Sequence, residues 1–249
     1  MKHFFIVARE DKEETLQFIR KLSDYIEMRG SCSYGINPDD ALEAELEVPS
    51  ETQGIFVIGG DGTVIRAAQN IFGKNIPMIG INRGHLGYLC DLDEESVYDA
   101  IDALMADDYA IEERMMLSGH IIDAAGKVGK DIQALNDIVL CSSAGLRVMR
   151  VVVYVNGQYL YAYNCDGMIF STPTGSTAYN LSANGPIVNP TTNIILLTPI
   201  NPHTLNARSI VLDPYDELVL EIEARREDGD DEAEISFDGN HKRLLHPGE

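Results

Sequence analysis

The chain has 249 residues, of which 45% are hydrophobic and 24% charged, as in ordinary globular proteins. A net charge of −21 at pH 7 argues against nucleic acid and anionic membranes as partners, because binding to either depends on Lys and Arg. No apolar run reaches the ~20 residues that a membrane-spanning helix needs. The four cysteines include no Cys-x-x-Cys pair, which favours a reducing, cytoplasmic environment without a disulfide framework or zinc site.

The first part of the chain alternates short apolar runs with helical patterns. Residues 4–8, 55–58 and 77–81 are candidate strands, whereas apolar residues recur at helical spacing within 16–26, 64–71 and 97–104. Strands that alternate with helices are typical of βαβ units around a parallel sheet. We therefore expect an α/β, Rossmann-like domain over residues 1–112.

The pattern changes after Arg114, where many short candidate strands are separated by turn residues. These strands lie near 115–123, 131–141, 147–155, 158–164, 193–199, 208–213, 217–224 and 233–237. Asn156-Gly157 between two of them is a strong signal for a tight hairpin. The sequence therefore predicts an all-β sandwich domain over residues 113–239.

Residues 59–63, Gly-Gly-Asp-Gly-Thr, follow one candidate strand and open a helix. In that position backbone N–H groups and the helix dipole bind phosphate, and glycines allow the close approach. Asp61 would repel phosphate, so it is interpreted as a general base for a hydroxyl or as a magnesium ligand. The structural alternative is a tight turn in which Asp61 only caps the helix.

Residues 166–182 form a second distinctive segment, in which a strand leads into a loop rich in glycine and hydroxyl side chains. Its serines and threonines could bind ribose hydroxyls or phosphates, and Tyr179 could stack on a base. A plain loop of the sandwich is the alternative. A serine hydrolase is disfavoured, because the segment contains no Gly-x-Ser-x-Gly motif.

Together with other segments, these two motifs resemble the bacterial NAD kinase family. The similarity runs in order along nearly the whole chain and rests on residues 59–63, 80–89, 135–137, 166–182 and 238–239. The first motif is shared with diacylglycerol-type lipid kinases and 6-phosphofructokinases, whereas Asn-Arg-Gly-His-Leu-Gly at 82–87 has the NAD kinase form. The resemblance implies an N-terminal domain of the NAD kinase/diacylglycerol kinase type and a C-terminal β-sandwich.

The resemblance also implies a reaction and a set of site residues. The terminal phosphoryl group of ATP, or of another donor, would pass to the 2′-hydroxyl of the adenosine ribose of NAD and give NADP, with Asp61 accepting the hydroxyl proton. Asp137 stands where the family usually has Glu. Substrate contacts are expected at Gly62, Arg66, Asn136, Asp137, Arg147, Asp166, Thr177, Ala178, Tyr179, Asn180, Leu181, Ser182, Asn201 and Asn240.

Two anionic substrates on an acidic protein require charge neutralisation. Magnesium carried with ATP is the expected divalent cofactor, and Arg66, Arg83 and Arg147 are candidate local cations. Ion pairs are the structural alternative for Arg83 and Arg147. By resemblance the protein forms a homodimer or homotetramer, and residues 240–249 pack back on the N-terminal domain.

Two other functions compete with this interpretation. A lipid kinase would carry a basic or apolar surface that attracts membranes, which the charge of −21 disfavours. A nucleotide-binding regulator without turnover would gain little from a carboxylate near phosphate, so Asp61 argues against it.

Overall fold

The computed structural model describes residues 1–8, 12–36, 46–83, 87–143, 148–204, 206–223 and 232–249. The chain divides into two compact units, Met1–Glu112 and Glu113–Glu249, and each is described by itself. Within the described ranges, no helix has the length and apolar character required to cross a membrane.

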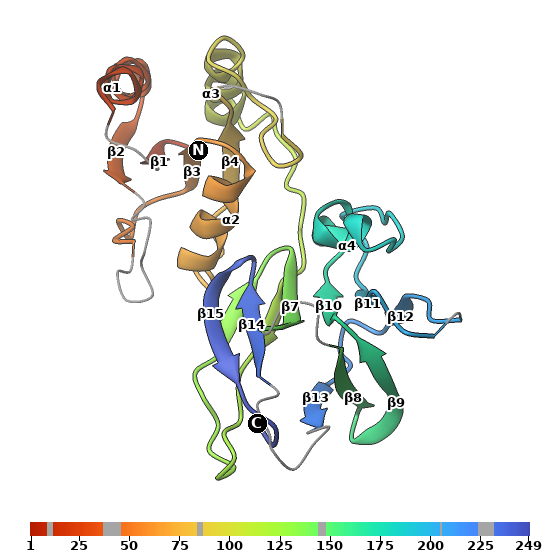
Figure 1. Ribbon diagram of the computed structural model, residues 1–249. Helices are drawn as coiled ribbons and strands as arrows, with labels where there is room; N and C mark the ends of the chain where they lie inside the picture. The colour runs from red at the N-terminus through yellow and green to blue at the C-terminus, as the bar shows by residue number, and fades with distance from the viewer. Residues whose placement is uncertain (9–11, 37–45, 84–86, 144–147, 205, 224–231) are drawn as a thin grey trace. The chain divides into compact units, whose positions relative to one another are not determined.

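The first unit is a four-stranded parallel sheet with the strand order β2-β1-β3-β4 (Figure 1). The strands are β1 (His3–Ala8), β2 (Ser31–Ile36), β3 (Gly54–Ile58) and β4 (Met78–Ile81). Three helices connect or follow them, namely α1 (Glu13–Glu27), α2 (Asp61–Asn70) and α3 (Val97–Met105). The predicted α/β architecture is confirmed.

Both faces of this sheet are covered, which explains the continuous apolar runs of its strands. Alternate residues of β1 point to opposite faces. Phe4 and Ile6 pack with apolar residues of α1 and α3, whereas Phe5 and Val7 pack with α2. Helices on both faces leave the ends of the strands as the places where loops can form a site.

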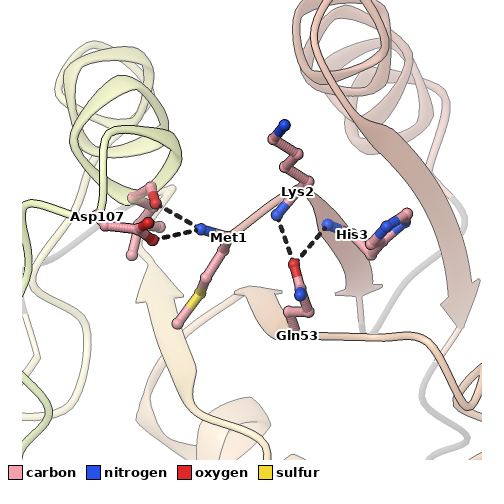
Figure 2. A network of polar contacts seen from close by, with 6 residues as sticks. Met1, Lys2, His3, Gln53 and Asp107 are labelled. Carbon is pink, nitrogen blue, oxygen red and sulfur yellow. Dashed lines mark hydrogen bonds and ion pairs between the residues drawn. The ribbon is translucent and has the colours of Figure 1, made fainter.

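A polar network fixes the edge of the sheet at which the parallel strands begin (Figure 2). Gln53 Oε1 accepts the backbone N–H groups of Lys2 at 2.6 Å and His3 at 3.3 Å. The amino group of Met1 donates to Asp107 Oδ1 and to the Leu104 carbonyl, both at 2.9 Å. These contacts join β1, the segment before β3 and the end of α3. The glycine turn before α2 lies at the opposite edge, where the strands end.

Every strand pair in the described part of the second unit is antiparallel. The unit has a six-stranded sheet with the order β12-β11-β10-β7-β14-β15 and a three-stranded sheet with the order β13-β8-β9 (Figure 1). A separate pair is formed by β5 and β6. The strands are β5 (Leu117–Gly119), β6 (Ile132–Ala134), β7 (Asp137–Ser142), β8 (Met149–Val155), β9 (Gln158–Cys165), β10 (Gly167–Ser171), β11 (Ile195–Ile200), β12 (Ile210–Leu212), β13 (Leu218–Glu223), β14 (Ala233–Phe237) and β15 (Asn240–Leu245).

One hydrophobic core joins the two larger sheets of this unit, as in a sandwich. Leu140, Met168 and Phe170 of the six-stranded sheet share it with Val151 and Val153 of the three-stranded sheet. The predicted β-rich architecture is confirmed. Sequence reasoning missed β2 and β15, which carry few apolar residues, and the segment predicted as one strand over 131–141 contains both β6 and β7.

Candidate active site

The glycine turn of the first unit joins β3 to α2 at the carboxyl edge of the parallel sheet. Gly59 has φ +156°, and a Cβ there would lie 2.3 Å from Thr63 Oγ1, so this position requires glycine. The Thr63 N–H donates to the Gly60 carbonyl at 2.8 Å and begins the helix. A Cβ on Gly60 or Gly62 would meet no atom within 4 Å. The start of α2 therefore has room for a ligand against its backbone.

The carboxylate of Asp61 is held by the loop that follows β4. Its Oδ2 accepts the Tyr88 N–H at 2.9 Å and its Oδ1 accepts the Leu89 N–H at 3.0 Å. A Cβ on Gly87 would lie only 2.1 Å from Asp61 Oδ1, so the loop reaches Asp61 because residue 87 is glycine. Gly60 occupies the N-cap position and no side chain caps the helix. The alternative interpretation of Asp61 as a helix cap is therefore wrong.

Cys90 is buried beside this carboxylate. Burial, and then the charges of Asp61 and Asp91, raise the pKa of its thiol to about 11. The thiol is therefore neutral at physiological pH and adds no second negative charge next to Asp61. Its Sγ lies 3.4 Å from the Gly59 carbonyl, which it contacts as a weak donor.

The candidate cations have different surroundings. Arg66 is half-buried on α2, one helical turn after Gly62. Arg83 forms an ion pair with Glu94, donates to Thr15 Oγ1 at 2.9 Å and lies over the Phe18 ring. The ion-pair alternative therefore describes Arg83, because its guanidinium is engaged within the first unit. Arg147 lies outside the described residues.

In the second unit, three segments meet at the start of β7. The Asp238 carboxylate, in the turn between β14 and β15, accepts N–H groups from Leu135 at 2.8 Å, Asn136 at 2.7 Å and Asp137 at 3.0 Å. From the glycine-rich loop, Thr172 Oγ1 donates to the Leu135 carbonyl at 2.6 Å and the Thr172 N–H donates to the Asn136 carbonyl at 2.9 Å. The backbone of residues 135–137 is thus fixed from two directions.

The side chains of Asn136 and Asp137 are unusually placed for polar groups. Among the described residues, Asn136 Oδ1 is the one buried side-chain oxygen or nitrogen without a hydrogen-bond partner. Asp137 is only 6% exposed, and burial, followed by the nearby charge of Asp238, raises the pKa of its carboxyl to about 7. A buried oxygen without a hydrogen bond and a buried carboxyl both lower the free energy of unfolding unless a ligand forms hydrogen bonds with them. This segment is therefore a candidate binding site.

The loop after β10 forms a 3₁₀ turn, η1 (Thr174–Thr177), and one turn of helix, α4 (Tyr179–Ser182). Asn180 is fully buried: its amide donates to the carbonyls of Ser176 and Pro186, and its Oδ1 accepts from Thr198 Oγ1 at 2.7 Å. The polar atoms of this side chain are engaged inside the loop, which indicates a structural role, and the expected substrate contact at Asn180 stays a prediction.

The other predicted residues of this loop are accessible. Tyr179 is 44% exposed, Leu181 and Ser182 are exposed, and Thr177 and Ala178 are half-buried. Burial, then the charges of Cys141 and Asp137, raise the pKa of Tyr179. Tyr179 therefore lies along β7, on the side of the sheet that Cys141 and Asp137 share.

Asp166 lies at the opposite end of β10 from Asp137. Its Oδ2 accepts from Asn201 Nδ2 at 3.0 Å, and His203 Nε2 lies 4.0 Å from its Oδ1. Gly167 pairs with Cys141 and Ser171 with Asp137, four residues apart, which corresponds to about 14 Å along the strand. Two groups of predicted residues therefore lie at opposite ends of β10, Asn136 with Asp137 and Asp166 with Asn201. Asn240, at the start of β15, donates to the Asp238 carbonyl at 3.2 Å.

The described residues contain no group of three or more His, Cys, Asp or Glu side chains that could hold a metal ion. Sequence reasoning did not anticipate the parts played by Gly87, by the Tyr88 and Leu89 amides or by Asp238. These residues lie in or beside segments 80–89 and 238–239, but a backbone contact leaves little trace in the sequence.

Comparison with known proteins identifies the family. The model of the ATP-NAD kinase N-terminal domain matches residues 7–109, and that of the ATP-NAD kinase C-terminal domain matches residues 135–249. An NAD kinase of Agathobacter rectalis is 46% identical over 100% of this chain and 88% of its own length. An NAD kinase of Lachnoclostridium phytofermentans is 36% identical over 98% of this chain and 87% of its own length.

Two solved structures share the fold. Yeast NADH kinase, complexed with NADH, has a TM-score of 0.85 and 24% identity over 100% of this chain and 76% of its own. An NAD kinase from Archaeoglobus fulgidus, in complex with ATP, has a TM-score of 0.77 and 22% identity over 98% of this chain and 87% of its own. With both domain models and full-length relatives in agreement, the chain belongs to the NAD kinase family and is a phosphotransferase.

Proposed function

We propose that this chain transfers the terminal phosphoryl group of ATP to the 2′-hydroxyl of the adenosine ribose of NAD, with Asp61 as the general base. The observation that carries this proposal is the fixed Asp61 carboxylate at a glycine-lined helix start. Phosphoryl transfer depends mainly on positioning and on charge neutralisation, and a held carboxylate supplies the first for an attacking hydroxyl.

The hydrogen bonds of Asp61 leave it able to accept a proton. A carboxylate has about four lone-pair positions, and the Tyr88 and Leu89 amides take two of them. A ribose hydroxyl within hydrogen-bond distance would donate to one of the others and lose its proton as the new O–P bond forms. Gly62 would lie against the substrate, and Arg66 would approach its phosphates.

The second unit would bind the dinucleotide. Asn136 Oδ1 would accept a hydrogen bond from the adenosine half, which gives this buried oxygen a partner, and Asp137 would contact the same half. Thr177 and Ala178 would lie near adenine, and Tyr179, Leu181 and Ser182 towards the nicotinamide side. Asp166, Asn201, Asn240 and Arg147 would complete the contacts. A dinucleotide is long enough to use both groups along β10.

Magnesium would enter with ATP. Mg²⁺ keeps several water ligands and is commonly held by substrate phosphates with few protein ligands, so this site needs no cage of side chains. The ion supplies neutralisation of the phosphate charge, which a chain of net charge −21 otherwise lacks.

A cytoplasmic location and a homodimeric or homotetrameric state belong to the same proposal. All four cysteines lie among the described residues and all are free thiols, as expected in a reducing compartment. Sedimentation of the purified protein would establish the number of subunits.

The test is incubation with NAD, ATP and magnesium, followed by enzymatic assay of NADP, with a parallel sample in EDTA. We expect NADP in the first sample and none in the second. Asp61→Asn should lower kcat by about 10²–10⁴-fold, the usual contribution of a general base, while calorimetry still detects NAD binding. NAD binding without NADP formation by the wild-type chain would instead indicate a regulator, and unchanged turnover of Asp61→Asn would remove Asp61 from the mechanism.

A further inference from the structure

Asp238 connects two segments that are about a hundred residues apart in the sequence. It sits in the two-residue turn between β14 and β15, with φ +50°, followed by Gly239 with φ +70°. Its carboxylate accepts the N–H groups of three consecutive residues, Leu135, Asn136 and Asp137, and its own N–H donates to the Asp137 carbonyl at 2.8 Å. Hydrogen bonds to an ionised acceptor are among the stronger ones in proteins.

These bonds determine how residues 135–137 present their side chains. The opposite side of the same segment is held by Thr172, and a Cβ on Gly175 would lie 2.2 Å from the Asn136 carbonyl oxygen. The backbone therefore has little freedom, and Asn136 Oδ1 stays in a buried place where it has no partner in the described chain. A buried acceptor kept unpaired in this way is suited to a donor on a ligand.

Asp238 also contributes to the electrostatics of this segment. Its charge adds to the effect of burial in raising the pKa of Asp137 to about 7. Tyr179 of α4 interacts electrostatically with Cys141 and with Asp137. His241 lies near Asp238, where burial lowers the pKa of the imidazole although Asp238 opposes this. Among the described residues, Asp238 and Tyr179 thus interact electrostatically with Asp137, and His241 interacts with Asp238.

We propose that Asp238 is a positioning residue for NAD, which holds the backbone of residues 135–137 so that Asn136 and Asp137 meet the dinucleotide, without touching it itself. This inference rests on the proposed role of Asn136 and Asp137 in substrate binding. The geometry favours a positioning role because three amides take three of the roughly four lone-pair positions of the Asp238 carboxylate and hold it against the backbone of residues 135–137.

The test compares Asp238→Asn, Asp238→Glu and wild type in NAD kinase assays between pH 5.5 and 8.5. Asparagine keeps one acceptor but loses the charge, so we expect KM for NAD to rise about 10- to 100-fold with a much smaller change in kcat. Because the pKa of Asp137 is about 7, we expect KM to change with pH near 7. This transition should move to lower pH in Asp238→Asn, because the charge of Asp238, the second cause of the raised pKa after burial, is removed. Glutamate keeps the charge but displaces it, so KM should rise while the transition stays near pH 7.

Asp123→Asn is the matched control, because Asp123 accepts the Ala125 and Lys127 amides in an exposed turn of the same unit. Its KM and pH profile should equal those of wild type. If Asp238→Asn yields less active protein but its KM for NAD equals that of wild type, the proposal is overturned. If Asp238→Asn does not fold, the KM of Asp238→Glu for NAD is the deciding measurement, and an unchanged value would overturn the proposal. Absence of NADP formation by the wild type would contradict the proposed function instead.

Discussion

Replacement of Asp137 by asparagine should change how the stability of the protein depends on pH. In the folded chain the Asp137 carboxyl is buried beside Asp238, and its pKa rises from 3.8 to about 7. A raised carboxyl pKa means that the folded state binds the proton more tightly than the unfolded state. The stabilisation is therefore complete below pH 3.8 and is lost as the pH rises through 7. An asparagine side chain at this position cannot ionise and has no such dependence.

The size of the effect follows from the two pKa values. Integrating the difference in bound protons between pH 5 and pH 8 gives a loss of about 2–3 kcal/mol in the free energy of unfolding of the wild type. The free energy of unfolding of Asp137→Asn, relative to wild type, should therefore increase by that amount over the same interval. Titrating groups that do not interact with Asp137 cancel in this comparison, since both proteins carry them in the same surroundings.

Urea unfolding followed by far-UV circular dichroism at pH 5, 6, 7 and 8 measures this difference. Asp123→Asn, at an exposed turn, should keep a constant difference from wild type over the whole range. If Asp137→Asn behaves in the same way as Asp123→Asn, Asp137 does not titrate in this range and the argument from its burial is refuted.

Two further substitutions test the glycine loop and the buried amide. Gly87→Ala should lower kcat about 100-fold, because the added methyl group would lie 2.1 Å from Asp61 Oδ1 and a displacement of the carboxylate by about 1 Å can lower the rate by that factor. Tyr88→Ala is the control: it keeps the N–H group, removes an exposed side chain and should retain activity. Equal kcat values in the two variants would refute the close contact between residue 87 and Asp61. Asn180→Ala should lower the free energy of unfolding by about 2–4 kcal/mol, because it leaves buried partners unsatisfied; an unchanged thermal midpoint would contradict the structural role of this residue.

Much of the fold could be predicted because burial leaves a periodic pattern. β1 and β3 are covered on both faces and read as unbroken apolar runs. Asn156 and Gly157 have φ of +51° and +73°, as the hairpin signal predicts. β2 was missed because it is an edge strand with the sequence SCSYGI, and β15 because its sequence NHKRLL is largely polar. Edge strands need few apolar residues, so periodicity says little about them.

The candidate site was less accessible to sequence reasoning than the fold. The motif around Asp61 predicted where a helix begins, but the partners of its carboxylate are backbone groups 27 and 28 residues further on. Arg83 and Asn180 stand in motif segments, yet tertiary contacts occupy their polar atoms. Which side of a motif faces inward depends on packing between distant segments, and a single sequence does not contain that information.

The manner in which Asp61 is held affects how this loop can change during evolution. Its two donors belong to the peptide backbone, which every residue except proline provides. Tyr88, which is 73% exposed, can therefore be replaced by almost any other residue without loss of the hydrogen bond from its backbone N–H to the carboxylate. Position 87 has no such freedom, so a single small residue preserves the arrangement while its neighbours diverge.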